Sequence, residues 1–194
     1  MPRWWSSTNV FHERWCKTDL GAVIICNVAG LSGASEYGMQ LMSRHVILFY
    51  STKDAYGEFS NFAAFPIEVD GRTWPTSEHY FQAQKFAGTE HEELIRTTPS
   101  PMTVAKIGRD RKRPLRADWE DVKDSIMRKA VWAKFNQHPR LAAMLIGTGD
   151  AEIVEHTEND AYWGDGGDGR GQNRLGQILM QVRMAILRES KDRV

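Results

Sequence analysis

The apolar positions of the chain first follow a strand pattern and later a helical one. His45 to Tyr50 is a short apolar run, rich in β-branched and aromatic residues, that predicts a buried strand. Two short runs, residues 66–69 and 72–74, flank the dipeptide Asp70-Gly71, which is a strong signal for a tight turn. The pattern therefore predicts a strand followed by a hairpin.

Helical periodicity dominates after Gly88. Ser100-Pro101 is an N-cap followed by proline at the first helical position, and Asp118 is placed to cap a longer helix. The predicted elements are helices over 90–96, 100–108, 118–137, 139–146 and 175–188, with a short strand at 153–154. These elements predict an α+β domain in which a small early sheet packs against a mainly helical body.

The stretch from Trp74 to Phe86 predicts a helix that carries a polar stripe. Pro75 and Thr76 supply a stop and a cap, and Glu78, Gln82 and Lys85 then recur on one side of the helix. The seven steps from Glu78 to Lys85 fall about 20° short of two full turns. An apolar stripe of Tyr80, Ala83, Phe86 and Ala87 lies elsewhere on the helix. Periodicity alone leaves open whether the polar stripe faces solvent or a pocket.

Residues 1–44 lack the patterns seen in the rest of the chain. Trp4, Trp5 and Trp15 are scattered among polar residues without helical or strand period. We therefore divide the chain into an irregular extension, 1–44, and one folded domain, 45–194, and we place no function in the extension.

Composition narrows the classes of partner. Lys plus Arg and Asp plus Glu balance at 25 each, which disfavours a nucleic-acid-binding module but leaves nucleotide-sized ligands open. The most apolar run, residues 20–31, is about twelve residues long, well short of the ~20 that span a bilayer. The two cysteines, Cys16 and Cys26, provide no disulfide framework, so a reducing cytoplasm is expected. Nothing in the pattern indicates an oligomeric state.

A glycine-rich run lies just before the last predicted helix. Gly166 and Gly167 belong to this run, and Arg170 and Arg174 add positive charge before a helix N-terminus. Such a loop presents backbone N–H groups to anions such as phosphate, although glycine-rich loops are also common as surface turns. The spacing does not match a calcium loop or a zinc motif, so we expect no metal and no cofactor.

Aromatic and acidic residues adjoin each other in the same run. Tyr162 and Trp163 lie between Asp160 and Asp165, an arrangement that suits a stacking surface beside carboxylates. A structural role for Trp163 fits the composition equally well. His79 points away from Glu78 on the predicted helix and is expected to pack or cap.

Four runs together resemble the YbiA/NADAR family. They are Y-G-x-F-S-N-F at 56–62, W-P-T-S-E-H-Y-F-Q-A-Q-K-F at 74–86, P-M-x-x-A-x-x-G-R-D-R at 101–111 and H-T-E-N-D-A-Y-W-G-D-G-G-x-G-x-G-x-N-x-L-G at 156–176. The similarity covers roughly residues 46–188 in order. It implies a YbiA-like fold and an N-glycosidase that hydrolyses early riboflavin-pathway intermediates, the ribosylaminopyrimidine 5′-phosphates. The products are the free aminopyrimidine and ribose 5-phosphate.

The resemblance also implies site residues. It carries over Glu78, Lys85, Asp160 and Trp163, with Trp119 and Asn159 as further candidates. We assign Lys85 as a nucleophile that forms a Schiff base with the sugar and Glu78 as the acid/base. Asp160 would stabilise positive charge or orient water, and Trp163 would stack on the pyrimidine. The loop with Gly166, Gly167 and Arg174 would take the 5′-phosphate.

Three alternatives stay open at this point. In the first, Lys85 only binds ribose or phosphate, and Glu78 does the acid/base work through water. Relatives in the family remove ADP-ribose from guanine, so ADP-ribosylated guanine is a rival substrate. A nucleotide-binding module without turnover is the rival from another class.

Overall fold

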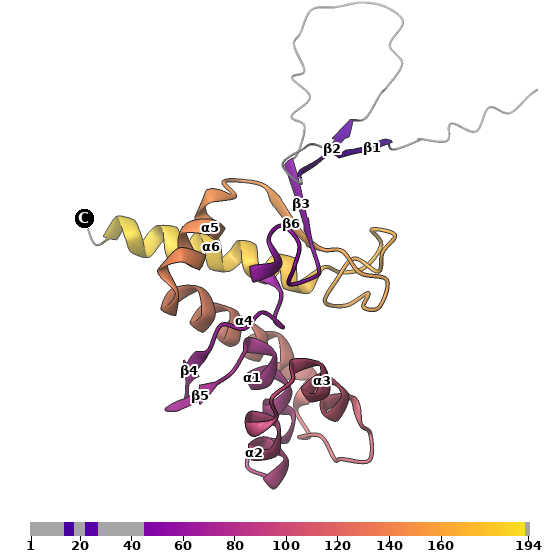
Figure 1. Cartoon of the computed structure of the whole chain (residues 1–194), viewed down its shortest axis with the longest axis vertical. Coiled ribbons are helices and arrows are strands. Elements are labelled where there is room, and N and C mark those ends of the chain that lie inside the picture. Colours follow the sequence, from indigo (N-terminus) through magenta and orange to yellow (C-terminus); the bar gives the residue numbers. More distant parts are fainter. Residues whose placement is uncertain (1–13, 18–21, 27–44, 193–194) are drawn as a thin grey trace, which may run out of the picture.

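The computed structural model describes residues 14–17, 22–26 and 45–192 (Figure 1). The strands are β1 (Arg14–Lys17), β2 (Ala22–Cys26), β3 (His45–Phe49), β4 (Ile67–Val69), β5 (Arg72–Trp74) and β6 (Glu152–Glu155). The helices are α1 (Ser77–Ala83), α2 (Glu90–Thr97), α3 (Pro101–Arg109), α4 (Trp119–Gln137), α5 (Pro139–Gly147) and α6 (Arg174–Asp192), with 3₁₀ turns η1 (Gly57–Phe59) and η2 (Gln84–Phe86). The α+β prediction is confirmed.

The main sheet joins segments from both ends of the described chain. Its strand order is β1-β2-β3-β6, with β1, β2 and β3 antiparallel and β6 parallel to β3. Two points differ from the sequence prediction. The sheet is not confined to the early part of the chain, and residues 14–17 and 22–26 form strands where an irregular extension was expected. The second of these strands contains the β-branched run Val23-Ile24-Ile25, which favours extended backbone. The domain boundary at residue 44 stays a prediction.

The long helix α4 lies in the middle of the molecule (Figure 1). It packs against α1 on one side and against α5 and α6 on the other, while α1 also contacts α2 and α3. Phe59, Trp74, Tyr80, Phe135 and Leu145 lie in the continuous core that results. Each of these side chains is almost fully buried, so the core fixes α1 relative to the rest of the domain.

The hairpin β4–β5 turns as its sequence predicts. Asp70 and Gly71 both adopt positive φ, 55° and 71°, which suits a tight two-residue turn. The Gln137 side chain at the end of α4 holds the hairpin, because it accepts from the Glu68 N–H and donates to the Glu68 carbonyl, each at 2.8 Å. The hairpin thereby leads the chain directly into α1.

The helix boundaries follow the predictions closely, with three differences. The helix predicted up to Phe86 is α-helical only from Ser77 to Ala83, and Lys85 lies in the 3₁₀ turn η2 that continues it. Helix α6 begins at Arg174 and continues to Asp192, beyond the predicted end. Asp118 makes no capping hydrogen bond with α4, because its carboxylate pairs instead with Arg116 at 2.6 Å. None of the helices in the described part of the chain is long and apolar enough to cross a bilayer.

Candidate active site

Helix α1 is buried along its whole length and is tightly held at its start. The Thr76 hydroxyl accepts the N-capping hydrogen bond from the His79 N–H at 3.3 Å, and the Glu78 N–H donates to the Asn61 carbonyl at 3.1 Å. The His79 ring lies between Thr76 Oγ1 and the Thr98 carbonyl, each 2.8 Å away. Burial lowers the pKa of His79, which favours the neutral ring. The prediction that His79 packs and caps is confirmed.

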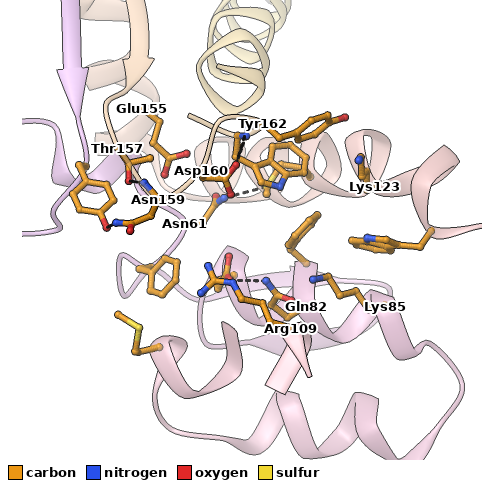
Figure 2. Close-up of a pocket in the computed structure, with 18 of the residues that line it drawn as sticks. Asn61, Gln82, Lys85, Arg109, Lys123, Glu155, Thr157, Asn159, Asp160 and Tyr162 are labelled. Atoms are coloured by element: carbon orange, nitrogen blue, oxygen red, sulfur yellow. Dashed lines mark hydrogen bonds between the residues drawn. The ribbon is translucent and has the colours of Figure 1, made fainter. Parts of the chain in front are cut away.

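A cavity of about 730 Å³ opens beside α1. Its two walls come from different parts of the chain (Figure 2). Gln82, Lys85 and Arg109 lie on one side, and Glu155 and Asp160 lie opposite them. The volume falls within the range of about 300–1,000 Å³ usual for small-molecule sites. The polar stripe of α1 therefore faces a pocket rather than solvent.

Glu78 lines this pocket with only 5% of its surface exposed. Its Oε1 accepts a hydrogen bond of 2.8 Å from Gln82 Nε2, the next polar residue of the stripe. Burial raises the pKa of Glu78, and the Gln82 hydrogen bond and the nearby Lys85 only partly offset this effect. A carboxyl in this state suits proton transfer near neutral pH.

Lys85 follows α1 in the turn η2 and also lines the pocket. Its Nζ donates to the Gly108 carbonyl at 3.1 Å and lies 5.4 Å from the Trp119 ring and 5.7 Å from the Phe81 ring. Burial lowers the pKa of Lys85 to about 8, despite the opposing charge of Glu78. The amine is thus poised to lose its proton close to physiological pH.

Gln82 is held by a close approach between α1 and α3. A Cβ on Gly108 would lie 1.8 Å from Gln82 Oε1, so any other residue at this position of α3 forces the Gln82 side chain to move. Gln82 Oε1 is buried and has no hydrogen-bond partner within the described residues. The amide is therefore confined in one place and has one unused acceptor beside the pocket.

The opposite wall comes from the loop after β6. Asp160 Oδ1 accepts hydrogen bonds from the N–H groups of Tyr162 (2.9 Å) and Trp163 (2.8 Å), which fixes the turn. Trp163 packs edge-on against Phe81 of α1 with a centroid distance of 5.3 Å. The structure thus brings six predicted residues to one pocket, namely Glu78, Lys85, Trp119, Asn159, Asp160 and Trp163.

The glycine-rich loop does not face the pocket. Gly166, Gly167 and Arg174 are absent from the pocket lining. The Arg174 guanidinium instead pairs with Asp124 of α4, and it donates to Gln177 Oε1 at 2.7 Å. Arg174 therefore ties the start of α6 to α4, which favours the surface-turn alternative for this part of the run.

Asp165 organises that turn from within. It accepts hydrogen bonds from the N–H groups of Thr157 (3.1 Å) and Gly167 (2.9 Å) and from His156 Nδ1 (2.7 Å). Burial alone would raise the pKa of Asp165, but these hydrogen bonds outweigh burial and lower it. The carboxylate is thus a structural anion that shapes the loop. No group of three or more potential metal ligands occurs in the described residues.

Sequence reasoning missed several pocket residues. Asn61 lies in the run 56–62, where polar residues alternate with aromatic ones, and it lines the pocket. Its side-chain amide donates a hydrogen bond to Met127 Sδ and accepts one from the Ser77 hydroxyl. Arg109, Lys123 and Glu155 also line the pocket. The only sequence signal for Asn61 and Arg109 is that both fall inside the family-like motifs, and Glu155 directly precedes one.

An acid and an amine in one aromatic-walled pocket of an α+β fold define a small-molecule site suited to acid/base and nucleophilic chemistry. The comparisons are specific. A family model described as NADAR domain matches residues 48–187. The chain is 62% identical over 143 residues to N-glycosidase YbiA of Escherichia coli (strain K12), covering 74% of this chain and 89% of that protein. The chain belongs to the NADAR domain family.

A solved structure and one further relative agree with this assignment. The NMR structure of the Escherichia coli protein YbiA matches with a TM-score of 0.71 at 61% identity, covering 75% of this chain and 86% of that chain. Riboflavin biosynthesis protein VVA0006 of Vibrio vulnificus (strain YJ016) is 43% identical over 137 residues, covering 71% of this chain and 37% of that protein.

Proposed function

We propose that this protein is an N-glycosidase that hydrolyses ribosylaminopyrimidine 5′-phosphates, early intermediates of the riboflavin pathway, to free aminopyrimidine and ribose 5-phosphate. The observation that carries the proposal is the placement of the Lys85 amine and the buried Glu78 carboxyl in one pocket. The names of the relatives, N-glycosidase and riboflavin biosynthesis protein, support the reaction and the substrate class.

Lys85 acts as the nucleophile in this proposal. The anomeric carbon of a ribosylamine is attacked by the Lys85 amine, and the sugar is then held as a Schiff base until water releases it. An ionised Glu78 nearby would normally keep Lys85 protonated. Burial opposes this by lowering the pKa of Lys85 to about 8 and by raising the pKa of Glu78. A neutral amine is therefore accessible at physiological pH.

Glu78 handles protons during hydrolysis of the sugar adduct. Its carboxyl is positioned by Gln82 at 2.8 Å, so its orientation toward the pocket is fixed. Asp160 stabilises positive charge at the sugar, because one of its oxygens already binds the backbone and holds the carboxylate in place. Trp163 and Trp119 present aromatic surfaces on which the pyrimidine stacks, and Asn159 binds polar substrate groups.

We assign the 5′-phosphate to Arg109 rather than to the loop at Arg174. Arg109 lies at the pocket, and in the part of the chain that the structure describes its guanidinium has no ion pair or hydrogen bond. Arg174 is already neutralised by Asp124. A free guanidinium offers two parallel donors to a phosphate, which suits this role.

ADP-ribosylated guanine is the second candidate substrate. The observation that favours it is the cavity volume of about 730 Å³, in the upper half of the usual range of about 300–1,000 Å³. The reaction is the same cleavage of an N-glycosidic bond, but the substrate is longer by a phosphate and an adenosine.

The test is incubation of the purified protein with each substrate, with release of ribose 5-phosphate or ADP-ribose measured directly. We expect release from the ribosylaminopyrimidine phosphate. Cleavage of ADP-ribosylated guanosine alone would reverse the ranking of substrates, and binding of both without turnover would establish a binding module.

A second experiment tests the role of Lys85. Borohydride reduction during turnover should trap a sugar adduct that mass spectrometry detects on the wild-type protein. Lys85→Ala should abolish the adduct, while the exposed Lys106→Ala on α3 serves as the matched control and should retain it. An adduct that persists in Lys85→Ala would disprove the assignment.

A further inference from the structure

Glu155 lies where strand β6 ends at the pocket. It is the last residue of β6, and it lies opposite Phe49, the last residue of the parallel strand β3. In open α/β sheets, ligands bind outside the carboxyl ends of the parallel strands, and β3 and β6 are the parallel pair of this sheet. The residues that follow these ends, Tyr50 and Thr157, line the pocket together with Glu155.

The Glu155 side chain faces the pocket without a partner of its own (Figure 2). Within residues 45–192 its backbone N–H and carbonyl are engaged by Asn173 and Asp165, but no group hydrogen-bonds its carboxyl. The other pocket acids differ in this respect. Glu78 accepts from Gln82, Asp160 accepts from two backbone N–H groups, and Glu120 pairs with Lys123. Glu155 is therefore the carboxyl that is left for a ligand.

The surroundings of Glu155 keep a proton on its carboxyl. Burial, followed by the negative charges of Asp160, Glu78 and Asp165, raises the pKa of Glu155 to about 8. The cationic groups Lys85 and Arg109 lie on the opposite wall of the pocket (Figure 2). A carboxyl that is neutral near pH 7 donates a hydrogen bond or a proton, which an ordinary glutamate does not.

We propose that Glu155 is the general acid that protonates the departing nitrogen of the base. This inference rests on the proposed N-glycosidase function and divides the acid/base work between two carboxyls. An amine leaves poorly as an anion, so cleavage of its bond to the sugar requires a proton donor. When the Lys85 amine attacks the anomeric carbon, the base leaves from the opposite face of that carbon. A proton donor for the base must therefore lie on the wall opposite Lys85, where Glu155 is found.

The step balances as follows. A bond forms between Lys85 Nζ and the anomeric carbon while the bond from that carbon to the base nitrogen breaks. The electron pair of the broken bond stays on the nitrogen, which takes the proton of the Glu155 carboxyl and leaves as a neutral amine. Water then attacks the anomeric carbon of the lysine adduct while the bond from that carbon to Lys85 Nζ breaks. The electron pair of this bond returns to Nζ, which leaves as the neutral amine. Glu78, as a carboxylate, accepts a proton from the attacking water and later releases it to solvent. Glu155, now a carboxylate, regains a proton from solvent after the products depart.

Two substrates separate this role from a structural one. The first is the ribosylaminopyrimidine 5′-phosphate, whose leaving amine needs a proton. The second is 4-nitrophenyl riboside 5′-phosphate, whose leaving phenolate is stable without one. Glu155→Gln keeps the size and neutrality of the side chain but removes the proton, and Glu152→Gln, at an exposed position of the same strand, is the matched control.

We expect Glu155→Gln to lower kcat/KM for the aminopyrimidine substrate by about 100-fold or more, the usual contribution of a general acid. We expect a change of less than about 5-fold for the nitrophenyl substrate and for Glu152→Gln on either substrate. Equal losses on both substrates, or no loss on the first, would overturn the role of Glu155.

The pH profile provides an independent readout. The loss of wild-type activity on the aminopyrimidine substrate as pH rises above about 8 should be absent in Glu155→Gln, since the group that loses its proton is gone. Persistence of that loss in the variant would overturn the assignment. A wild-type protein that cleaves neither substrate would instead refute the proposed function, and the role of Glu155 with it.

Discussion

Gly108→Ala tests the close approach between α1 and α3. The added Cβ would lie 1.8 Å from Gln82 Oε1 and 2.7 Å from Gln82 Cδ, so the Gln82 side chain must move. Gln82 is only 5% exposed, and its Nε2 holds Glu78 at 2.8 Å. We expect the movement to break this hydrogen bond, because the crowded pocket floor leaves the amide no equivalent position.

The expected change in the free energy of unfolding follows from one stabilising and two destabilising effects. Alanine in place of glycine favours a helix by about 1 kcal/mol. Overpacking costs about 1–3 kcal/mol, and leaving the buried Glu78 carboxyl without its hydrogen bond costs about 1–3 kcal/mol. The unfavourable effects win, and we expect a net loss of roughly 2–4 kcal/mol in the free energy of unfolding. For a chain of this size that corresponds to a fall in Tm of about 5–15 °C.

The assay is thermal unfolding followed by circular dichroism, combined with the pH dependence of turnover. The Gln82 hydrogen bond lowers the pKa of Glu78, so its loss should shift the acidic limb of the kcat/KM profile to higher pH. Gly147→Ala at the exposed end of α5 is the matched control, because a Cβ there meets no atom within 4 Å. A Gly108→Ala protein that has the same Tm as the Gly147→Ala control and keeps the wild-type pH profile would refute the reasoning.

Three further changes test the pocket and the core. Arg109→Gln should raise KM for the phosphorylated substrate by about 10-fold or more, since a guanidinium–phosphate pair contributes about 1.5–3 kcal/mol. The weak cleavage of the dephosphorylated riboside should be unchanged. Equal losses on both substrates would contradict the phosphate role of Arg109. Trp163→Leu should raise KM by about 5–10-fold through loss of stacking, measured by steady-state kinetics with the protein's melting curve as control. Burial lowers the pKa of Lys134 to about 7, so the unfolded chain binds the extra proton between about pH 7 and 10.5 and stability rises with pH across that window. In denaturant titrations Lys134→Met should remove this rise, up to about 1.4 kcal/mol per pH unit, and a variant with the wild-type slope would refute the prediction.

Local features of the chain were predictable because their causes are local. The cap at Thr76, the Asp70-Gly71 turn and the helical period of α4 each depend on residues within a few positions of one another. The parallel pairing of β3 with β6 was not predictable in this way. Val46 pairs with Glu152, and the short apolar run of β6 carries no information about which strand it joins.

The same distinction applies to the site. Glu78 and Lys85 lie seven positions apart in one long family-like motif, so their common pocket was predictable. The role assigned to Arg174 depended on whether a partner neutralises it, and that partner, Asp124, lies on another helix. Charge pairing between distant residues leaves no pattern in a single sequence. Glu155 was missed because a glutamate at the end of a short strand usually faces water, whereas here the strand ends inside the pocket.

The pairing of β3 with β6 has a consequence for how the protein folds. Closing a loop of about 100 residues costs roughly 4 kcal/mol in chain entropy before any contact across it is gained. The helices between the two strands form from local contacts, so we expect them to assemble first and the strand pairing to follow. Until these strands pair, the wall that carries Glu155 and Asp160 is not held opposite the wall that carries Lys85. The protein thus acquires a site for its ligand only at the last stage of folding.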